Sequence, residues 1–360
     1  MRHRYSGVET STSDDIPLDQ RRKVTGENRH SATTRLLTTK EVFDLVREDM
    51  ERVEVEFCRQ SASSIPLITE IGQYLQVSGG KRLRPVLVLL AAKLCGYEGA
   101  PAIRLGAAFE MIHTATLVHD DVIDKAETRR GRPSINVRWG NHSSVLAGDW
   151  LYMQAFSTAL AERNFKILDL LIGLTQVMVE GELLQLAYLR KTDLTEDDYF
   201  ELTYRKTACL FSACVRAGAL LADKPEEEEN LLASYGVNLG LAFQLIDDVL
   251  DFTSSEEKLG KPIGNDLREG KVTLPLIYLL QECTPEEAQK LARVFEDGGF
   301  QHVAFAEIVE LVERYEALGR ARAKAKKFAE EAKHCLEGFP ESVYKDALMS
   351  LPEFIIARES

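Results

Sequence analysis

The chain has 360 residues, of which 45% are apolar and 28% charged, the composition of a globular protein with enough apolar side chains for a large core. Its 57 acidic residues against 44 basic ones give a formal net charge of −13. This charge argues against a nucleic-acid partner, because phosphate backbones require a basic face. The longest apolar runs, such as residues 85–92, fall well short of the roughly 18–20 residues that span a bilayer, which excludes a transmembrane helix.

The cysteines and the N-terminus indicate a compartment. The six cysteines are scattered and form no CxxC pair, which excludes a disulfide framework and a zinc ribbon. The N-terminus lacks the apolar segment of a secretory signal. We therefore expect a reducing, cytoplasmic location.

Residues 1–37 are polar and show no periodicity. Because the stretch contains both acidic and basic residues, it does not match a transit peptide, which is poor in acids. We expect a disordered tail. An organellar leader is the alternative.

Helical patterns begin at Thr38, where Thr38 or Thr39 can cap a helix. Apolar residues then recur at spacings of three and four: Phe43, Val46, Met50, Val53 and Phe57. Later helical stretches end at Gly96, Gly140 or Gly338, and runs that alternate between apolar and polar residues are scarce. The sequence therefore predicts an all-α single domain over residues 38–360, built as a large bundle around a central cavity.

Two matching aspartate motifs are the most informative feature. Asp120-Asp121-Val-Ile-Asp124 and Asp247-Asp248-Val-Leu-Asp251 both read DDxxD within apolar helical stretches. The first and last aspartates of each motif share a helix face, where they would repel each other unless a cation compensates. Mg²⁺ fits such oxygen ligands, whereas the spacings of zinc sites and EF-hands are missing. A solvated helix face is the alternative for either motif alone.

Basic groups surround these motifs in the sequence. Residues 79–85 read GGKRLRP and place Lys81 and Arg84 just before a helix expected to start near Pro85. Further basic residues are Arg129, Arg130, Lys206, Lys261 and Lys271. Each could be an ordinary surface residue, but acids for Mg²⁺ together with bases for phosphate indicate a diphosphate ligand. The motifs of P-loop proteins and protein kinases are absent.

Six segments occur in the order GGKRLRP, HTATLVHDDVIDKAETRRGRPS, GDWL, Lys206-Thr207, FQLIDDVLDF and GKPIGNDLREGKVTLP. In these segments the chain resembles the all-trans polyprenyl diphosphate synthases, over roughly residues 40–360. The resemblance implies an all-α bundle around a deep hydrophobic cavity and a homodimer. It also implies a Mg²⁺-dependent prenyltransferase that joins isopentenyl diphosphate to an allylic diphosphate, with farnesyl or geranylgeranyl diphosphate as the expected primer.

The resemblance also implies roles for individual residues. Three Mg²⁺ ions would bind to ligands from both motifs: Asp120, Asp124, Asp247 and Asp251, with Asp121 and Asp248 beside them. The groups expected to hold isopentenyl diphosphate are Lys81, Arg84, His113 and Arg130. Those expected at the allylic diphosphate are Arg129, Lys206, Lys261 and Lys271, with Thr207 and Gln244 at the reacting carbon.

Product length is a separate expectation. In the family, residues upstream of the first motif line the growing product; here they are Met111, Ile112, Ala115 and Thr116. The small Ala115 predicts an open wall and a product of C30 to C50, a precursor of a quinone side chain. Met153 and Phe156 are candidates for the cavity floor, although both could be plain core residues. Release of so apolar a product could involve transient membrane contact.

Several alternatives stay open at this stage. A short-chain farnesyl or geranylgeranyl diphosphate synthase is the nearest. The C-terminus, FIIARES, lacks the charged closing motif of some short-chain enzymes. A class I terpene cyclase and a subunit of a heteromeric synthase fit less well, because both aspartate motifs and GGKRLRP are complete.

Overall fold

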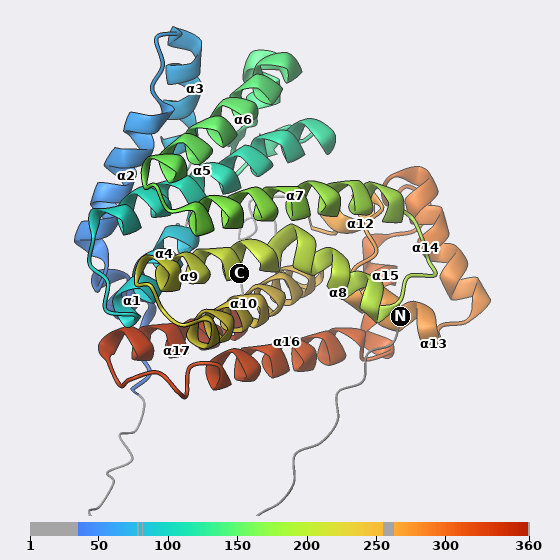
Figure 1. Ribbon diagram of the computed structural model, residues 1–360. Coiled ribbons are helices and arrows are strands. Elements are labelled where there is room, and N and C mark those ends of the chain that lie inside the picture. The colour runs from blue at the N-terminus through green and yellow to red at the C-terminus, as the bar shows by residue number, and fades with distance from the viewer. Residues whose placement is uncertain (1–34, 78, 81, 255–262, 359–360) are drawn as a thin grey trace, which may run out of the picture. The chain divides into compact units, whose positions relative to one another are not determined.

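The computed structural model describes residues 35–77, 79–80, 82–254 and 263–358, and it is almost entirely helical (Figure 1). Only a two-stranded antiparallel hairpin interrupts the helices within these ranges, formed by β1 (Thr128–Arg129) and β2 (Arg132–Pro133). The prediction of an all-α fold is confirmed.

The helices of the N-terminal part are α1 (Thr39–Asp44), α2 (Arg47–Ser61), α3 (Pro66–Val77), α4 (Leu83–Leu94), α5 (Ala100–Ile123), α6 (Ile135–Ala161) and α7 (Phe165–Tyr188). Next come α8 (Glu196–Thr203), the π-helical turn η1 (Tyr204–Ala208), α9 (Cys209–Leu221) and α10 (Glu226–Thr253). The C-terminal part contains α12 (Asn265–Glu269), α13 (Leu274–Glu282), α14 (Pro285–Asp297), α15 (Phe305–Arg314), α16 (Ala317–His334) and α17 (Val343–Ile356).

Local sequence explains where several helices begin and end. Thr38 starts α1 with a capping box, in which its hydroxyl accepts from the Glu41 amide and the Glu41 carboxylate accepts from the Thr38 amide. The predicted continuous helix from residue 38 is divided, because Val46 leaves the helical conformation between α1 and α2. Gly140, predicted as a helix end, instead lies at a kink inside α6, where it has φ 81°.

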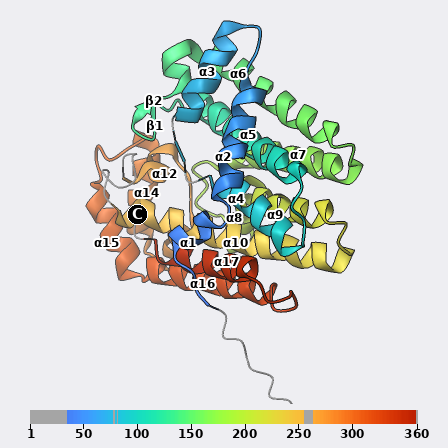
Figure 2. The same cartoon turned by 90° about the vertical axis from the view of Figure 1, so that its left-hand side faces the viewer.

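The centre of the fold is formed by α4, α5, α9 and α10. Residues 85–92 of α4 are buried on every side, as expected for a helix that is apolar all round. Glycine permits its close packing against α9, because a Cβ at Gly218 would lie 2.5 Å from the Ala92 amide nitrogen. Helix α10 packs against α9 on one side and against α16 on another. Figure 2, viewed from the side of α2 and α3, shows α2 passing over α4 and α5.

The described chain joins the core before Thr38. Leu37 is buried, and its amide donates to Ser350 Oγ at 2.9 Å. Residues 1–34, which form most of the predicted tail, lie outside the described ranges. All six cysteines are free thiols. Among the helices described here, none is both long and apolar enough to cross a membrane.

Candidate functional site

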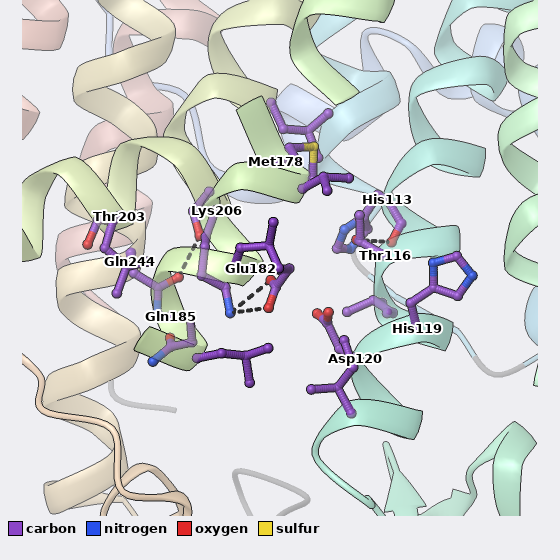
Figure 3. Close-up of a pocket in the computed structure, with 18 of the residues that line it drawn as sticks. His113, Thr116, His119, Asp120, Met178, Glu182, Gln185, Thr203, Lys206 and Gln244 are labelled. Atoms are coloured by element: carbon purple, nitrogen blue, oxygen red, sulfur yellow. Dashed lines mark hydrogen bonds and ion pairs between the residues drawn. The ribbon is translucent and has the colours of Figure 1, made fainter. Parts of the chain in front are cut away.

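A cavity of about 1140 Å³ lies among α5, α6, α7, η1 and α10. One part of its wall is polar and includes residues from both aspartate motifs. The rest is apolar and is contributed largely by α6 and α7. Figure 3 shows Asp120 of α5 facing Glu182 and Lys206, which come from α7 and η1. The chain thus brings segments more than 100 residues apart in sequence to one chamber.

The first aspartate motif lies at the C-terminal end of α5. Asp120 lines the cavity, and burial, followed by the nearby charge of Glu182, raises its pKa to about 7. Asp121 is buried and accepts from Arg129 Nε at 2.7 Å, and Asp124 is the C-cap of the helix. The carboxylates therefore have different surroundings, and Asp120 is the one most directly exposed to the cavity.

The second motif lies in α10. Asp247 and Asp248 both line the cavity. Asp248 accepts from Tyr199 Oη at 2.6 Å and from Gln244 Nε2 at 2.8 Å. Burial raises the pKa of Asp248 to about 8, and the charge of Asp266 adds to the effect. Both motifs therefore place carboxylate oxygens in one chamber, where burial disfavours the negative charge of Asp120 and Asp248.

Asp251 is placed differently from its prediction as a magnesium ligand. It is fully buried and does not line the cavity. Its two carboxylate oxygens accept from the backbone amides of Asn265 and Asp266, at 3.3 and 3.1 Å, at the start of α12. Asp251 therefore ties the end of α10 to α12, and its role as a metal ligand stays a prediction.

One group of basic residues lies around His113. Arg84, His113 and Arg130 all line the cavity. Arg84 packs on the rings of Phe211 and Phe243, with Cζ 4.9 and 5.7 Å from the ring centroids, and burial lowers its pKa. Burial, reinforced by Arg84 and Arg130, holds the pKa of His113 well below its usual range, so the imidazole is neutral near pH 7. This corner of the cavity is suited to an anion.

The GGKRLRP segment packs against the same corner. Gly80 has φ +154°, and a Cβ at this position would lie 2.5 Å from Arg130 Nη1. The helix begins at Leu83, with Arg82 as its N-cap, so Arg84 lies in the first turn and not before the helix as predicted. Arg82 turns toward Glu54 and Glu110, at 2.7 and 2.8 Å. Lys81 lies outside the described residues.

A second set of polar residues lies across the cavity. Lys206, in the π-helical turn η1, pairs with Glu182 at 2.8 Å. Thr207 Oγ1 donates to Gln244 Oε1 at 2.9 Å, and Gln244 in turn donates to Asp248 (Figure 3 shows Lys206, Glu182 and Gln244). Local π-helical turns are common at functional sites because they redirect side chains. Here the turn presents Lys206 and Thr207 to the cavity together.

The remaining predicted cations are Arg129, Lys261 and Lys271. Arg129 lines the cavity and pairs with Asp121. Lys271 lies 2.5 Å from Glu269 and 3.4 Å from Asp124. Although burial opposes the charge of Lys271, Asp266 and these carboxylates outweigh it, and the pKa of the amine is raised. Lys261 lies outside the described residues.

The residues predicted to control product length fall into two sets. Thr116, Met153 and Phe156 line the cavity, whereas Met111, Ile112 and Ala115 are fully buried elsewhere in the core. Helix geometry explains the difference: before the last turn of α5, the residues that line the cavity are His113, Thr116, Leu117 and Asp120, with His119 beside them, and Met111 and Ala115 lie on nearly the opposite side of the helix from His113, Thr116, Leu117 and Asp120. The expected open wall at Ala115 is therefore not part of this cavity.

The residues that were not predicted include three that contact predicted ones. Glu182 and Tyr199 pair with Lys206 and Asp248, and Arg358 lies 2.8 Å from Asp247. No short motif marks any of them in the sequence. Only the tertiary fold brings them to the predicted residues.

The structure offers a plain test of whether Mg²⁺ fits. Asp120, Asp247 and Asp248 provide hard oxygen ligands in one cavity, and two of them carry raised pKa values that a cation would reverse. Among the described residues, no three His, Cys, Asp or Glu side chains converge closely enough to hold a metal ion. The donor set therefore fits Mg²⁺ that takes its other ligands from water and substrate phosphate.

Known proteins resemble this chain over most of its length. The model of the polyprenyl synthetase family matches residues 65–312. The octaprenyl diphosphate synthase of Escherichia coli is 38% identical over 323 residues, which cover 90% of this chain and all of that protein. The all-trans-nonaprenyl-diphosphate synthase (geranyl-diphosphate specific) of Rhodobacter capsulatus is 40% identical over 82% of this chain and 91% of its own.

Solved structures agree with these relatives. A polyprenyl synthase from Caulobacter crescentus, complexed with calcium and isoprenyl diphosphate, superposes with a TM-score of 0.86. It is 37% identical, over 90% of this chain and 98% of that one. A decaprenyl diphosphate synthase from Rhodobacter capsulatus gives a TM-score of 0.84 at 36% identity, over 88% of this chain and 98% of that one. Taken with the motifs and the fold, these matches show that the chain belongs to the polyprenyl synthetase family.

Proposed function

We propose that this chain is a prenyltransferase that condenses isopentenyl diphosphate head-to-tail with an allylic diphosphate and makes an all-trans polyprenyl diphosphate of C30 to C50. The observation that supports this most strongly is the cavity itself. It joins residues of both aspartate motifs and two groups of cations to an apolar wall in one volume of about 1140 Å³. A charged head and a long hydrocarbon chain are the two parts of such a product.

The expected reaction needs charge stabilisation and not a protein nucleophile. The C–O bond of the allylic diphosphate breaks, the double bond of isopentenyl diphosphate attacks the allylic cation, and a C–C bond forms. A proton then leaves the new product for the released diphosphate, so atoms and charges balance. The cavity is suited to this sequence because its cations face the position of the leaving group and its apolar wall excludes water.

The two diphosphates are assigned to different groups of basic residues. Arg84, His113 and Arg130 share one corner, which we assign to isopentenyl diphosphate together with Lys81. Arg129, Lys206 and Lys271 lie beside the aspartate motifs, and we assign them to the allylic diphosphate together with Lys261. This division places the two substrates next to each other.

Mg²⁺ would be held mainly by Asp120, Asp247 and Asp248, with Asp124 close by, and three ions per site is our proposal. Bound there, the metal would neutralise charge on the leaving diphosphate. Thr207 and Gln244 would orient the reacting carbon through their hydroxyl and amide dipoles. The hydrogen bonds from Gln244 and Tyr199 to Asp248 hold this polar wall in place.

We further propose that the protein acts as a homodimer. Large apolar side chains are exposed along α6 and α7, among them Leu146, Phe165 and Leu183, which are 67%, 69% and 64% exposed. Several exposed members of this face, including Met153 and Leu183, also line the cavity. A second copy on this face would cover the apolar surface and complete the cavity wall. A cytoplasmic location and transient membrane contact during product release are part of the same proposal.

Product sizing tests the proposal. Purified protein is incubated with Mg²⁺, farnesyl diphosphate and excess isopentenyl diphosphate, and the products are measured by mass spectrometry. We expect chains of C30 or longer, a length that fits a precursor of a quinone side chain. Products that stop at C15 or C20 would overturn the long-chain assignment and leave the chemistry intact. Absence of any elongation would overturn the assignment of a self-sufficient synthase.

A further inference from the structure

The C-terminal end of the described chain reaches the second aspartate motif. Arg358 follows α17, and its Nη1 lies 2.8 Å from Oδ1 of Asp247. The guanidinium also lies over the ring of Phe243, with Cζ 4.8 Å from the centroid. Phe243 and Asp247 are one turn apart on α10, and both line the cavity. Arg358 therefore touches the edge of the proposed reaction site.

The contact is electrostatic and is not a well-aligned hydrogen bond. Arg358 Nε and Nη1 are buried, yet neither has a hydrogen-bond partner of normal geometry. The side chains of Arg358 and Asp247 are 21% and 33% exposed, so the pair lies near the protein surface although Nη1 itself is buried. Such a pair is weak, and a competing cation can replace it at modest cost.

The backbone before Arg358 is firmly held. Ile355 is buried, and Glu353 accepts from Lys333 Nζ at 2.6 Å. The Ala357 amide donates to the Glu353 carbonyl at 2.9 Å and closes the helix. The position of the guanidinium near α10 is thus set by α17, and only the long side chain has to move for Asp247 to be released.

We propose that Arg358 is the built-in counter-cation of the second aspartate motif, and that a divalent ion displaces it from Asp247. This inference rests on the proposed function, in which Asp247 is a metal ligand. A guanidinium and a divalent ion at the same carboxylate oxygen repel each other. Arg358 therefore sets the affinity of the motif for metal, and it screens Asp247 from the neighbouring carboxylates while the site is empty.

The test is binding of Mn²⁺, used as the probe for the divalent site and followed by the electron paramagnetic resonance signal of the free ion. The Arg358→Gln variant should bind Mn²⁺ about two- to fivefold more tightly than the wild type, the factor that corresponds to a partly exposed ion pair. Arg358→Lys keeps the charge and should restore most of the wild-type affinity.

Arg320→Gln is the matched control. Arg320 also pairs with a carboxylate, Glu282 at 2.6 Å, and lies over an aromatic ring, Tyr278 at 4.0 Å, but Glu282, unlike Asp247, does not line the cavity. If Arg358 merely anchored the C-terminus, Arg358→Gln would lower the melting temperature and leave the Mn²⁺ affinity equal to that of Arg320→Gln. That result would overturn the inference.

A second measurement uses the wild type and does not depend on the variant folding. Addition of Mn²⁺ with inorganic diphosphate should increase amide hydrogen exchange at Arg358 itself, which loses its ion pair, and should leave the firmly held residues 353–357 unchanged. Unchanged or slower exchange would contradict displacement. The elongation assay tests the proposed function separately. If the protein makes prenyl products but Arg358→Gln leaves its Mn²⁺ affinity unchanged, this inference is overturned and the proposed function is not.

Discussion

Individual carboxylates in the cavity show why the site favours binding of a cation. Asp120 and Asp248 carry pKa values raised to about 7 and about 8, in each case chiefly by burial. Removing a carboxylate from water disfavours its charged form, and a neighbouring acid adds to the penalty. A bound divalent ion would reverse both effects, so the same burial that destabilises the empty site increases the gain from binding metal.

These pKa values predict how the stability of the metal-free protein depends on pH. Asp120 and Asp248 bind protons more tightly in the folded than in the unfolded chain, where the ordinary value is 3.8. Their contribution to the free energy of unfolding is therefore complete below that value and is lost as pH rises through about 7 to 8. In a chelator, the melting temperature should fall by roughly 3–6 °C between about pH 5.5 and 8.5.

Asp120→Asn removes one of the two titrating groups and should reduce that fall, as measured by differential scanning fluorimetry. The control is Asp193→Asn at an exposed position, which should retain the full dependence. A melting temperature that rises over this pH interval in the metal-free wild type would show that Asp120 and Asp248 are charged in the folded protein without a penalty.

At the scale of elements, the face that α5 turns to the cavity decides which residues can limit product growth. His113, Thr116, Leu117 and Asp120 recur at spacings of three and four and all line the cavity. Thr116 lies about one turn before Asp120, so a growing chain attached at the aspartates would pass it early. Helix orientation therefore favours Thr116 over its neighbour Ala115 as the position where side-chain size matters.

Thr116→Phe is expected to shorten the product. The larger ring would enter the cavity, and since one helical turn of about 5 Å corresponds to roughly one isoprene unit, we expect products shorter by at least about two units. Mass spectrometry of the products measures the change. Thr116→Val, which removes the hydroxyl without adding size, should leave product length unaltered. An unchanged length in Thr116→Phe would mean that the chain grows along another wall.

Helical periodicity and motif chemistry predict much of this architecture before any coordinates. The fold class, the meeting of Asp120 with Asp247 and Asp248 at one cavity, and the placement of Arg84, His113 and Lys206 around it agree with expectation. What the sequence does not predict depends on tertiary contacts. Asp251 accepts from the first backbone amides of α12 because that helix lies next to the end of α10 in the fold. The spacing of the DDxxD motif does not predict this contact.

The contacts made by Glu182 and Arg358 illustrate the same limit. Glu182 pairs with Lys206 only because α7 packs on η1, and Arg358 reaches Asp247 only because α17 packs on α10. Neither residue belongs to a motif with fixed spacing. A sequence pattern predicts which residues react with or bind the substrate, whereas helix packing determines which residues form ion pairs with them.

For the molecule as a whole, the main feature is the apolar face of α6 and α7, which a single chain leaves exposed to water. Leu146 and Phe165 are as exposed as surface charged residues usually are, although each would gain about 2 kcal/mol from full burial. Because other members of the face line the cavity, association and product length should be linked. An incomplete wall would admit water and would give a long product no continuous apolar surface.

The double variant Leu146→Glu/Phe165→Glu tests this link. Two charges on the face should weaken association by roughly 1000-fold or more, because each would be buried unpaired against a second copy. Sedimentation velocity should show dimers for the wild type and monomers for the variant, whose longest products should also be lost. Val55→Glu on α2 is the control, because Val55 is 69% exposed and lies on a different element. If the wild type sediments as a monomer and still makes the same long products, the length of the product does not depend on association through the apolar face. The exposed side chains of α6 and α7 would then need a partner other than a second copy.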